Sequence, residues 1–325
     1  MALTSKIRVG VLRGGPSKEH DVSIKTGANV LKNLPENYSP IDIYIDKEGI
    51  WHVQGIAEDP SKVVRKIDIF FNALHGEYGE DGGLQHTLDL FGIPYTGSGR
   101  MASVFAMHKG HAKKFLDNHG IKSPYHRIYK KTDANLPTIA QLWKIIPNPS
   151  IVKPISGGSS IGVSLVQNPQ ELAEALDLAF SLSNEIIIEE YISGKEATCG
   201  VIDHYRSKSI YPLFPSEPVP LKNSRFFDHD SKFINKSRSI HPGRFSAMEK
   251  EAIQNAATTI HKVMGLRHYS RSDFIVNPKR GIYFLEVNSL PGLYINAPFT
   301  EALTAVGQTF SGFLDHVITL ALKGK

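Results

Sequence analysis

The sequence predicts an α/β protein with an open parallel sheet in its N-terminal part and an α+β arrangement in its C-terminal half. Strand-like and helix-like segments alternate from Lys6 to about Met107, the order that builds a parallel sheet. Near the other end, two strand-like runs at 270–276 and 282–287 are joined by five residues, which predicts an antiparallel hairpin. A chain of 325 residues has room for roughly two or three domains.

Composition narrows the class of partner. The chain has 37 Lys and Arg against 32 Asp and Glu, a net charge of +5, but no dense basic run of the kind that binds nucleic acid. A single cysteine, Cys199, excludes an internal disulfide and fits a reducing compartment. No apolar run is long enough to span a bilayer, and no secretion signal precedes the first strand. We therefore expect a cytoplasmic protein with anionic small-molecule ligands and neither nucleic-acid nor membrane partners.

The first hundred residues give the βαβ order in detail. The expected elements are a strand at 6–12, a helix at 21–34, and strands at 41–45 and 67–74. The turn after the first strand contains Gly10-x-x-x-Gly14-Gly15, which is not the dinucleotide fingerprint Gly-x-Gly-x-x-Gly. An NAD-dependent enzyme is therefore not favoured.

Two polar residues follow strands of this sheet. Glu19 comes after the first strand, and His75 opens a glycine-rich segment after the third. Ligands of open α/β sheets bind outside the carboxyl ends of the strands, so both side chains are predicted to share one crevice. The alternative is that the glycines only form turns and that His75 is exposed.

The middle of the chain carries a phosphate-binding pattern. A strand containing Lys153 leads into the glycine-and-serine segment 156–162, and a second strand follows. Backbone N–H groups of such a loop can hold phosphate, although the Walker pattern is absent and a plain hairpin loop would look similar. Upstream, a helix expected over 100–118 places Lys109 and Lys113 on one side, where lysines are usually solvated.

The remaining elements complete the predicted order. They are a surface connection at 130–149, a helix at 169–182, strands at 185–192 and up to 202, a long polar segment at 212–245, and helices at 247–264 and 300–322. Ser246 and Glu249 form a capping box for the helix at 247–264. The polar segment is long enough to be a lid or a disordered loop.

The C-terminal hairpin is the strongest candidate for chemistry. Glu286 and Asn288 are two residues apart, so they point to one face of the strand, and Asp273 on the partner strand can approach them. Three oxygen ligands on adjacent strands suit Mg²⁺, which binds together with substrate phosphates. The alternative is a structural carboxylate, Glu286, paired with Arg271.

The ordered set of motifs resembles the D-alanine–D-alanine ligases of the ATP-grasp superfamily, over about residues 6–322. The motifs are Gly14-Gly15-Pro16-Ser17-x-Glu19-x-Asp21-Val22-Ser23, His75-Gly76-x-x-Gly79-Glu80-Asp81-Gly82, Tyr95-Thr96-Gly97-Ser98, Lys153-Pro154 with Gly158-Ser159-Ser160-x-Gly162, Arg271-x-Asp273 and Glu286-x-Asn288-x-x-Pro291-Gly292. The resemblance implies an N-terminal substrate-binding domain (1–107), a central lid domain (108–200) and a C-terminal catalytic domain (201–325), the last two forming a two-part ATP-grasp fold. It favours functional roles over structural ones for Lys153 and the hairpin residues, because several levels of observation agree.

The resemblance also implies roles for individual residues. ATP would be held by Lys109, Lys153, Ser160, Glu189, Ile192 and Glu196. Two Mg²⁺ ions, or Mn²⁺ in their place, would be bound by Asp273, Glu286 and Asn288. The catalytic group would comprise Glu19, Ser159, Arg271 and the lid residue Lys232, and the amino-acid site would comprise Glu19, His75 and Gly292.

The implied reaction joins two D-alanines for cell-wall precursor synthesis, with release of ADP and phosphate. The carboxylate of one D-alanine is phosphorylated, and the amine of the second then displaces phosphate from the acyl phosphate. The family also implies a homodimer. Two rival functions stay open at this point: the same fold with another acceptor, D-lactate or a different amino acid, and a nucleotide-binding module without turnover.

Three positions depart from the family pattern. Phe233 stands where a tyrosine is common, and phenylalanine there accompanies tolerance of D-lactate. Ala297 stands where a serine usually helps to hold the carboxylate of the second substrate, so Asn296 or Tyr294 would have to replace that donor. Glu190 stands where a lysine is common. These departures leave the acceptor less well defined than the reaction type.

Overall fold

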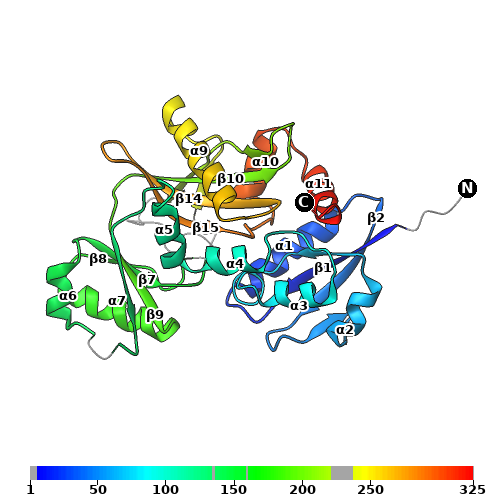
Figure 1. Ribbon diagram of the computed structural model, residues 1–325, viewed down its shortest axis with the longest axis horizontal. Helices are drawn as coiled ribbons and strands as arrows, with labels where there is room; N and C mark the ends of the chain where they lie inside the picture. The colour runs from blue at the N-terminus through cyan, green and yellow to red at the C-terminus, as the bar shows by residue number, and fades with distance from the viewer. Residues whose placement is uncertain (1–5, 134–135, 159, 221–236, 325) are drawn as a thin grey trace, which may run out of the picture.

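The computed structural model describes residues 6–133, 136–158, 160–220 and 237–324. The described chain contains three sheets of four or five strands and a two-stranded pair. Figure 1 shows three lobes: the first sheet with its helices, the sheet of β6 to β9, and the sheet of β10 and β14 with the C-terminal helices. The mixed α/β class predicted from the sequence is confirmed.

The N-terminal sheet has the order β4-β3-β2-β1-β5, with β1 parallel to both β2 and β5. The predicted parallel arrangement is therefore present, and two short antiparallel strands extend it. Its elements are β1 (Ile7–Gly14), α1 (His20–Asn33), β2 (Tyr38–Ile45), β3 (Trp51–Val53), β4 (Ile56–Ala57), α2 (Pro60–Val63), β5 (Ile69–Asn72), α3 (Gly83–Phe91) and α4 (Arg100–Met107).

The middle sheet is antiparallel and has the order β6-β9-β7-β8. Helices α6 and α7 pack on one another, and α7 covers the sheet through an apolar core that includes Val152, Leu172 and Ile188. The elements are α5 (Lys109–Asp117), β6 (His126–Lys130), α6 (Ile139–Ile145), β7 (Ser150–Pro154), β8 (Ser164–Val166), α7 (Pro169–Leu182) and β9 (Glu185–Glu190).

The C-terminal sheet is also antiparallel, with the order β11-β10-β14-β15. Helix α9 packs on it, and its predicted capping box of Ser246 and Glu249 is present. The elements are β10 (Lys195–Asp203), β11 (Ile210–Pro212), β12 (Glu217–Pro220), β13 (Ser237–Ile240), α9 (Ala247–Val263), β14 (Tyr269–Asn277), β15 (Gly281–Asn288), α10 (Pro298–Ala305) and α11 (Phe310–Leu322).

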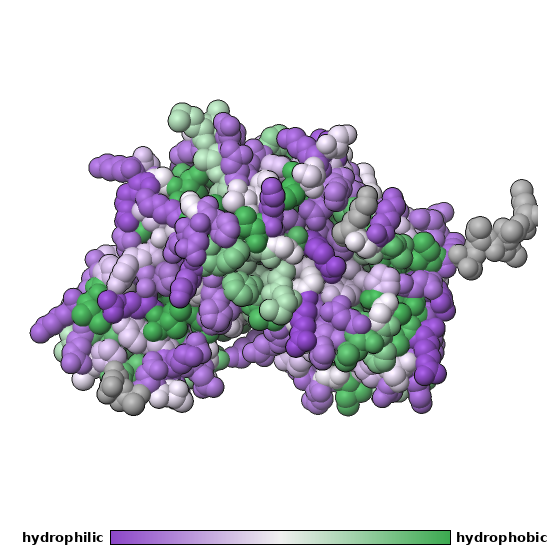
Figure 2. Space-filling view, in the orientation of Figure 1, coloured by the Kyte–Doolittle hydropathy of each residue, from purple (hydrophilic) through white to green (hydrophobic). Residues whose placement is uncertain are grey.

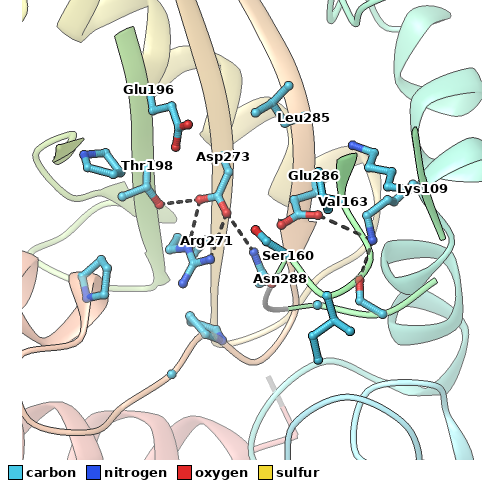
Figure 3. A pocket seen from close by; sticks show the side chains of 18 of the residues that line it. Lys109, Ser160, Val163, Glu196, Thr198, Arg271, Asp273, Leu285, Glu286 and Asn288 are labelled. Carbon is cyan, nitrogen blue, oxygen red and sulfur yellow. Dashed lines mark hydrogen bonds and ion pairs between the residues drawn. The ribbon is translucent and has the colours of Figure 1, made fainter. Parts of the chain in front are cut away.

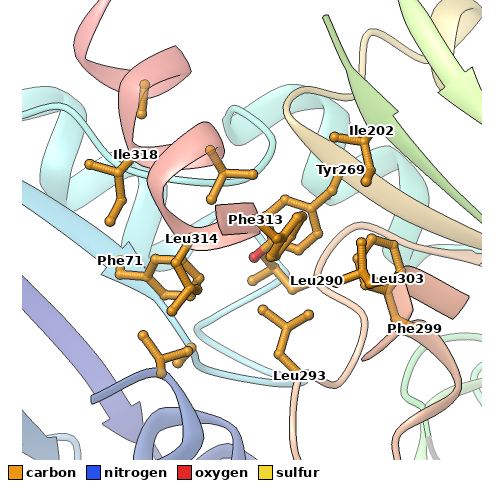
Figure 4. Packing of buried hydrophobic residues seen from close by; sticks show 14 of the residues in the cluster. Phe71, Ile202, Tyr269, Leu290, Leu293, Phe299, Leu303, Phe313, Leu314 and Ile318 are labelled. Atoms are coloured by element: carbon orange, nitrogen blue, oxygen red, sulfur yellow. The ribbon is translucent and has the colours of Figure 1, made fainter. Parts of the chain in front are cut away.

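One apolar core joins the two ends of the chain. Val9 on β1 and Phe71 on the edge strand β5 belong to the same buried cluster as Phe313 and Leu314 of α11. Figure 4 shows Phe71 facing Leu314 and Ile318, with Leu290 and Leu293 beside them. Burial of this many side chains at roughly 1.5–3 kcal/mol each favours a fixed relation between the N-terminal sheet and the segment after β15.

Three predicted elements are wrong in detail. The helix expected over 100–118 is divided into α4 and α5 because His108 has an extended backbone and its ring accepts a hydrogen bond from the N–H of His111. The segment 130–149, expected as a surface connection, contains α6, whose capping box is formed by Thr138 and Gln141. The helix expected over 300–322 is two helices, separated by a turn in which Gly307 has a φ of +73°.

The polar segment after Pro212 also contains more regular structure than expected. Strands β12 and β13 pair in antiparallel fashion on either side of it. The part between them, which carries the predicted lid, lies outside the described residues.

The face of the molecule drawn in Figure 2 is mainly polar. Figure 2 shows hydrophilic residues over most of one face, with hydrophobic residues in small separate groups and a notch between the middle and N-terminal lobes. In the described part of the chain, no helix combines the length and apolar character needed to cross a membrane.

Candidate active site

A cavity of about 580 Å³ is lined by residues of the middle and C-terminal sheets, of α1, and of the connections that follow β1 and β5 of the N-terminal sheet. That volume is within the usual range for small-molecule sites. Figure 3 shows the side chains of β10, β14 and β15 on one wall, facing the loop of Ser160 and the start of α5. The cavity therefore lies where the N-terminal, middle and C-terminal parts of the chain meet.

The Asp273 carboxylate is the centre of the C-terminal wall. The backbone register pairs Asp273 with Glu286 and Arg271 with Asn288, as the predicted hairpin requires. Asp273 accepts hydrogen bonds from Arg271 at 2.9 and 3.0 Å, from Thr198 Oγ1 at 2.5 Å and from Asn288 Nδ2 at 3.3 Å. Burial would lower the pKa of Arg271, but Asp273 raises it, so the guanidinium is held charged in the cavity.

Glu286 connects the same wall to the glycine-and-serine loop. Its Oε2 lies 3.5 Å from Nζ of Lys109, and that ammonium also donates to the carbonyl oxygen of Gly157 at 2.5 Å. Burial lowers the pKa of Lys109, an effect that Glu286 opposes. Glu286 is therefore paired with Lys109, and the structural alternative of a pair with Arg271 is wrong, because Arg271 binds Asp273.

A buried group of three charges forms the floor on the middle-sheet side. The two carboxylate oxygens of Glu189 on β9 lie 2.9 Å from Nζ of Lys153 and 3.2 Å from Nζ of Lys113. Lys113 also donates to the carbonyl of Phe284 on β15, which joins this group to the C-terminal sheet. The alternative that Lys109 and Lys113 are solvated, as lysines on helices usually are, is wrong, because both are buried in pairs with carboxylates.

These neighbours determine the charge state of Glu189. Burial alone would raise its pKa, but Lys113 and Lys153 lower it to about 2. Because the folded-state pKa is below the ordinary value of 4.5, this carboxylate contributes stability above pH 4.5 that is lost as the pH falls towards 2.

Replacing Glu189 by glutamine is expected to lower the free energy of unfolding by about 3–5 kcal/mol at pH 7, because two buried ammonium groups lose their partner. The variant should also lose less stability than the wild type between pH 4.5 and pH 2. Urea unfolding followed by the fluorescence of Trp51 and Trp143 at a series of pH values measures both effects.

Glu185→Gln is the matched control for that experiment. Glu185 lies on the same strand, but it is partly exposed and its partner Lys130 is exposed, so the expected change is below about 1 kcal/mol. Equal effects for Glu189→Gln and Glu185→Gln would show that burial does not set the strength of the Glu189 pairs.

Glu19 lies between two glycine segments. It precedes α1, and its carboxylate is so close to Gly76 and Gly158 that a Cβ on either would approach Oε2 to 3.0 and 2.8 Å. Glycine at these positions therefore leaves room for the Glu19 carboxylate where the N-terminal part meets the glycine-and-serine segment 156–162.

His75 shares the crevice with Glu19, as predicted, and the alternative of an exposed histidine is wrong. It is buried, its Nε2 lies 2.8 Å from Thr26 Oγ1, and its Nδ1 lies 3.8 Å from Glu80. Glu80 accepts hydrogen bonds from the N–H groups of Gly76 and Leu290. This carboxylate therefore ties the loop of His75 to the end of β15.

The other predicted site residues line the same cavity. Four are found there: Ser160, whose φ is +56°, Ile192, Glu196 and Gly292. Two more, Ser159 and Lys232, lie outside the described residues, as does Phe233.

Sequence reasoning did not single out Lys113, Thr198 or Glu80 as site residues. The spacing of four residues between Lys109 and Lys113 was the available signal for the first. Thr198 is brought to Asp273 by the pairing of β10 with β14, a long-range contact that local sequence does not encode.

The donor set on the C-terminal wall fits magnesium. Two carboxylates and an amide oxygen, on paired strands and beside a phosphate-type loop, leave the remaining coordination positions to water and phosphate. Asp273, Glu286 and Asn288 are the residues that would hold it. Among the described residues, no group of three or more His, Cys, Asp or Glu side chains forms a separate metal site.

Comparison with known proteins agrees with this site. The family model described as the D-ala D-ala ligase C-terminus matches residues 115–319, and that of the N-terminus matches 8–63 and 54–98. D-alanine–D-alanine ligases from Geobacter sulfurreducens and Bacillus anthracis are both 34% identical, over 98% of this chain and 96% and 98% of theirs.

Solved structures give the same result. A D-alanine–D-alanine ligase from Bacillus anthracis complexed with ATP superposes with a TM-score of 0.81 at 31% identity, covering 98% of both chains. The VanG D-Ala:D-Ser ligase from Enterococcus faecalis superposes with a TM-score of 0.84 at 29% identity, covering 98% of this chain and all of that one.

Two antiparallel sheets that enclose buried lysines and paired carboxylates, together with these matches, define an ATP-grasp enzyme, an ATP-dependent carboxylate–amine ligase. Within that class, the chain belongs to the D-alanine–D-alanine ligase family.

Proposed function

We propose that this enzyme joins two D-alanines into D-alanyl-D-alanine for peptidoglycan precursor synthesis, with cleavage of ATP to ADP and phosphate. The observation that carries the proposal is the convergence of Lys109, Lys153, Arg271 and the hairpin carboxylates on one cavity, next to Glu19 of the N-terminal part. Family membership supplies the substrate class.

The chemistry requires that a carboxylate and a phosphate, both anionic, come together. The carboxylate of the first D-alanine attacks the γ-phosphorus of ATP, and ADP leaves. The amine of the second D-alanine then attacks the carbonyl carbon of the acyl phosphate and displaces phosphate. Phosphoryl transfer depends mainly on positioning and charge neutralisation, which Lys153 and Arg271 are placed to provide.

The remaining roles follow from position in the cavity. Lys109, Lys153 and the backbone of the loop that contains Ser160 would bind the phosphates, with Ile192, Glu189 and Glu196 on the adenosine side. Glu19 would hold the ammonium of the first D-alanine, beside His75. Mg²⁺, when bound by Asp273, Glu286 and Asn288, would neutralise the phosphate oxygens. Ser159 and Lys232 keep the roles that the family implies.

The domain division 1–107, 108–200 and 201–325 belongs to the same proposal. It is supported by the three separate sheets: the first lies within 1–107 and the second within 108–200, while the third begins with β10 (Lys195–Asp203), which crosses the second boundary. A homodimer and a cytoplasmic location are further parts of it. The exposed apolar side chains of Leu90 and Met101 lie on α3 and α4 of the N-terminal part, where a second copy would bind.

The alternative function is a ligase of the same fold that uses an acceptor other than D-alanine, and Ala297 favours it. Its side chain is buried beside the cavity and cannot donate a hydrogen bond to a carboxylate. D-lactate and D-serine are the acceptors to compare with D-alanine.

Phosphate release from ATP in the presence of D-alanine alone, and of D-alanine with D-lactate or D-serine, tests the proposal. We expect release with D-alanine alone and a dipeptide product in the mass spectrum. A mixed product in preference to D-alanyl-D-alanine would favour the alternative acceptor. Tight ATP binding with no phosphate release under any condition would instead indicate a binding module and would refute both ligase proposals.

A further inference from the structure

A threonine on β10 contacts the Asp273 carboxylate from the side opposite β15. Thr198 pairs with Asp273 in the register of β10 and β14, so the two side chains lie on the same face of the sheet. Oγ1 of Thr198 donates a hydrogen bond to Oδ1 of Asp273 at 2.5 Å (Figure 3). A distance this short is typical of a hydroxyl that donates to an ionised carboxylate. Thr198 is buried, and it lines the cavity.

The backbone of Thr198 is fixed by a neighbouring segment. Its N–H donates to the carbonyl oxygen of Ser216 at 3.0 Å, and the N–H of Ser216 donates to the carbonyl oxygen of Thr198 at 2.8 Å. This bridge joins β10 to the residue that precedes β12. Because threonine is branched at Cβ, its χ1 is also restricted. The hydroxyl is therefore directed at the carboxylate by the fold.

The hydrogen bonds to Asp273 are divided among three strands. Among the described residues, Oδ1 accepts from Thr198 and from Nε of Arg271, and Oδ2 accepts from Nη2 of Arg271 and from Asn288. Two of these donors have proposed tasks towards a ligand, since Arg271 acts on the transferred phosphate and Asn288 binds magnesium. Thr198 is therefore the donor whose position depends on neither ligand.

A metal ligand binds best when its orientation is already set. Side chains that hydrogen-bond to a metal ligand orient it, and their loss typically weakens metal binding by about 10- to 100-fold. Arg271 can orient Asp273, but its guanidinium places a positive charge near the cation. The Thr198 hydroxyl is neutral, so it orients the same carboxylate without that repulsion.

We infer that Thr198 is a positioning residue for the proposed magnesium site. Its hydroxyl holds the Asp273 carboxylate in the orientation that binds the ion, which leaves Arg271 to act on the transferred phosphate. This inference rests on the magnesium site of the proposed function. It adds a residue of β10 to the metal side of the cavity, two positions after Glu196 on the same strand.

Thr198→Val tests the inference, because valine keeps the branched shape and loses the hydroxyl. The melting temperature of the enzyme with ADP is measured at increasing magnesium concentration, which requires no turnover. We expect the magnesium concentration that gives half of the stabilisation to rise about 10-fold or more. The magnesium dependence of phosphate release should shift in the same direction, and the Michaelis constant for D-alanine at saturating magnesium should not change.

Two further variants separate positioning from stability. Thr198→Ser keeps the hydroxyl and should restore the wild-type magnesium dependence. Thr87→Val removes a hydrogen bond to the carbonyl oxygen of Gly83 within α3, outside the cavity lining, and should leave that dependence unchanged. A wild-type magnesium dependence in Thr198→Val, or a lower melting temperature at every magnesium concentration without a shift in the dependence, would overturn the inference. Failure of Thr198→Ser to restore it would do the same.

The two readouts distinguish failure of the inference from failure of the proposed function. If the wild type releases no phosphate with D-alanine, the proposed function fails, and the melting assay still decides whether Thr198 supports magnesium binding. If the wild type releases phosphate and Thr198→Val melts as the wild type does at every magnesium concentration, only the inference fails. If magnesium with ADP does not stabilise the wild type, the magnesium site is wrong and the inference fails with it.

Discussion

Replacement of Arg271 by methionine is expected to lower kcat for D-alanine-dependent phosphate release by about 10³-fold, the lower end of the effect of a phosphate-facing arginine. Arg271 is partly buried on the cavity wall and points its guanidinium at Asp273, one of the proposed magnesium ligands. Methionine keeps the apolar length of the side chain and removes the charge. Stopped-time phosphate assays at saturating ATP and D-alanine measure kcat directly.

Two further variants separate charge from geometry. Arg271→Lys keeps the charge but loses the planar fork that donates two parallel hydrogen bonds, so we expect only a partial recovery of kcat. Arg8→Met removes an arginine from a largely exposed pair with Asp68 and should leave kcat within about twofold. A wild-type kcat in Arg271→Met would refute the proposed role of this arginine in the reaction.

The alternation of apolar residues and the turn residues predicted an element correctly where its structure depends mainly on its own local sequence. The hairpin of β14 and β15 follows from two apolar strands and a five-residue turn, and its register pairs the residues that the alternation of side chains had selected. The errors in the helices have one cause. Apolar periodicity continues through His108 and through the turn at Gly307, whereas the backbone is set there by a cap and by a left-handed residue.

The site shows the same division between local and long-range information. Asp273, Glu286 and Asn288 could be identified because they interrupt apolar strands. Burying a polar group is unfavourable unless a cation or a hydrogen-bond partner meets it. Burial of Lys113 could not be predicted in this way, because a lysine on a helix is usually solvated. Its partner Glu189 is 76 residues further along the chain, on strand β9 of the middle sheet. Only the packing of α5 between two sheets brings that carboxylate to it.

Glu286→Gln is the second variant with a large expected effect. It keeps the shape of the side chain and one oxygen ligand but removes the negative charge from the proposed magnesium site. Because a metal ion contributes several kcal/mol of charge stabilisation, we expect kcat to fall about 10²- to 10³-fold at a fixed magnesium concentration. The magnesium concentration that gives half-maximal activity should rise at the same time, and a Mg²⁺ titration of phosphate release measures both.

The titration also separates a metal ligand from a structural ion pair, since Glu286 lies 3.5 Å from Lys109. If its only role were that pair, Glu286→Gln would lower the melting temperature and leave the magnesium dependence unchanged. A metal ligand predicts the opposite: the shifted magnesium dependence persists under conditions where the variant is fully folded. Glu58→Gln, in a surface pair with Lys66, should change neither quantity, because an exposed carboxylate far from the cavity contributes little to either.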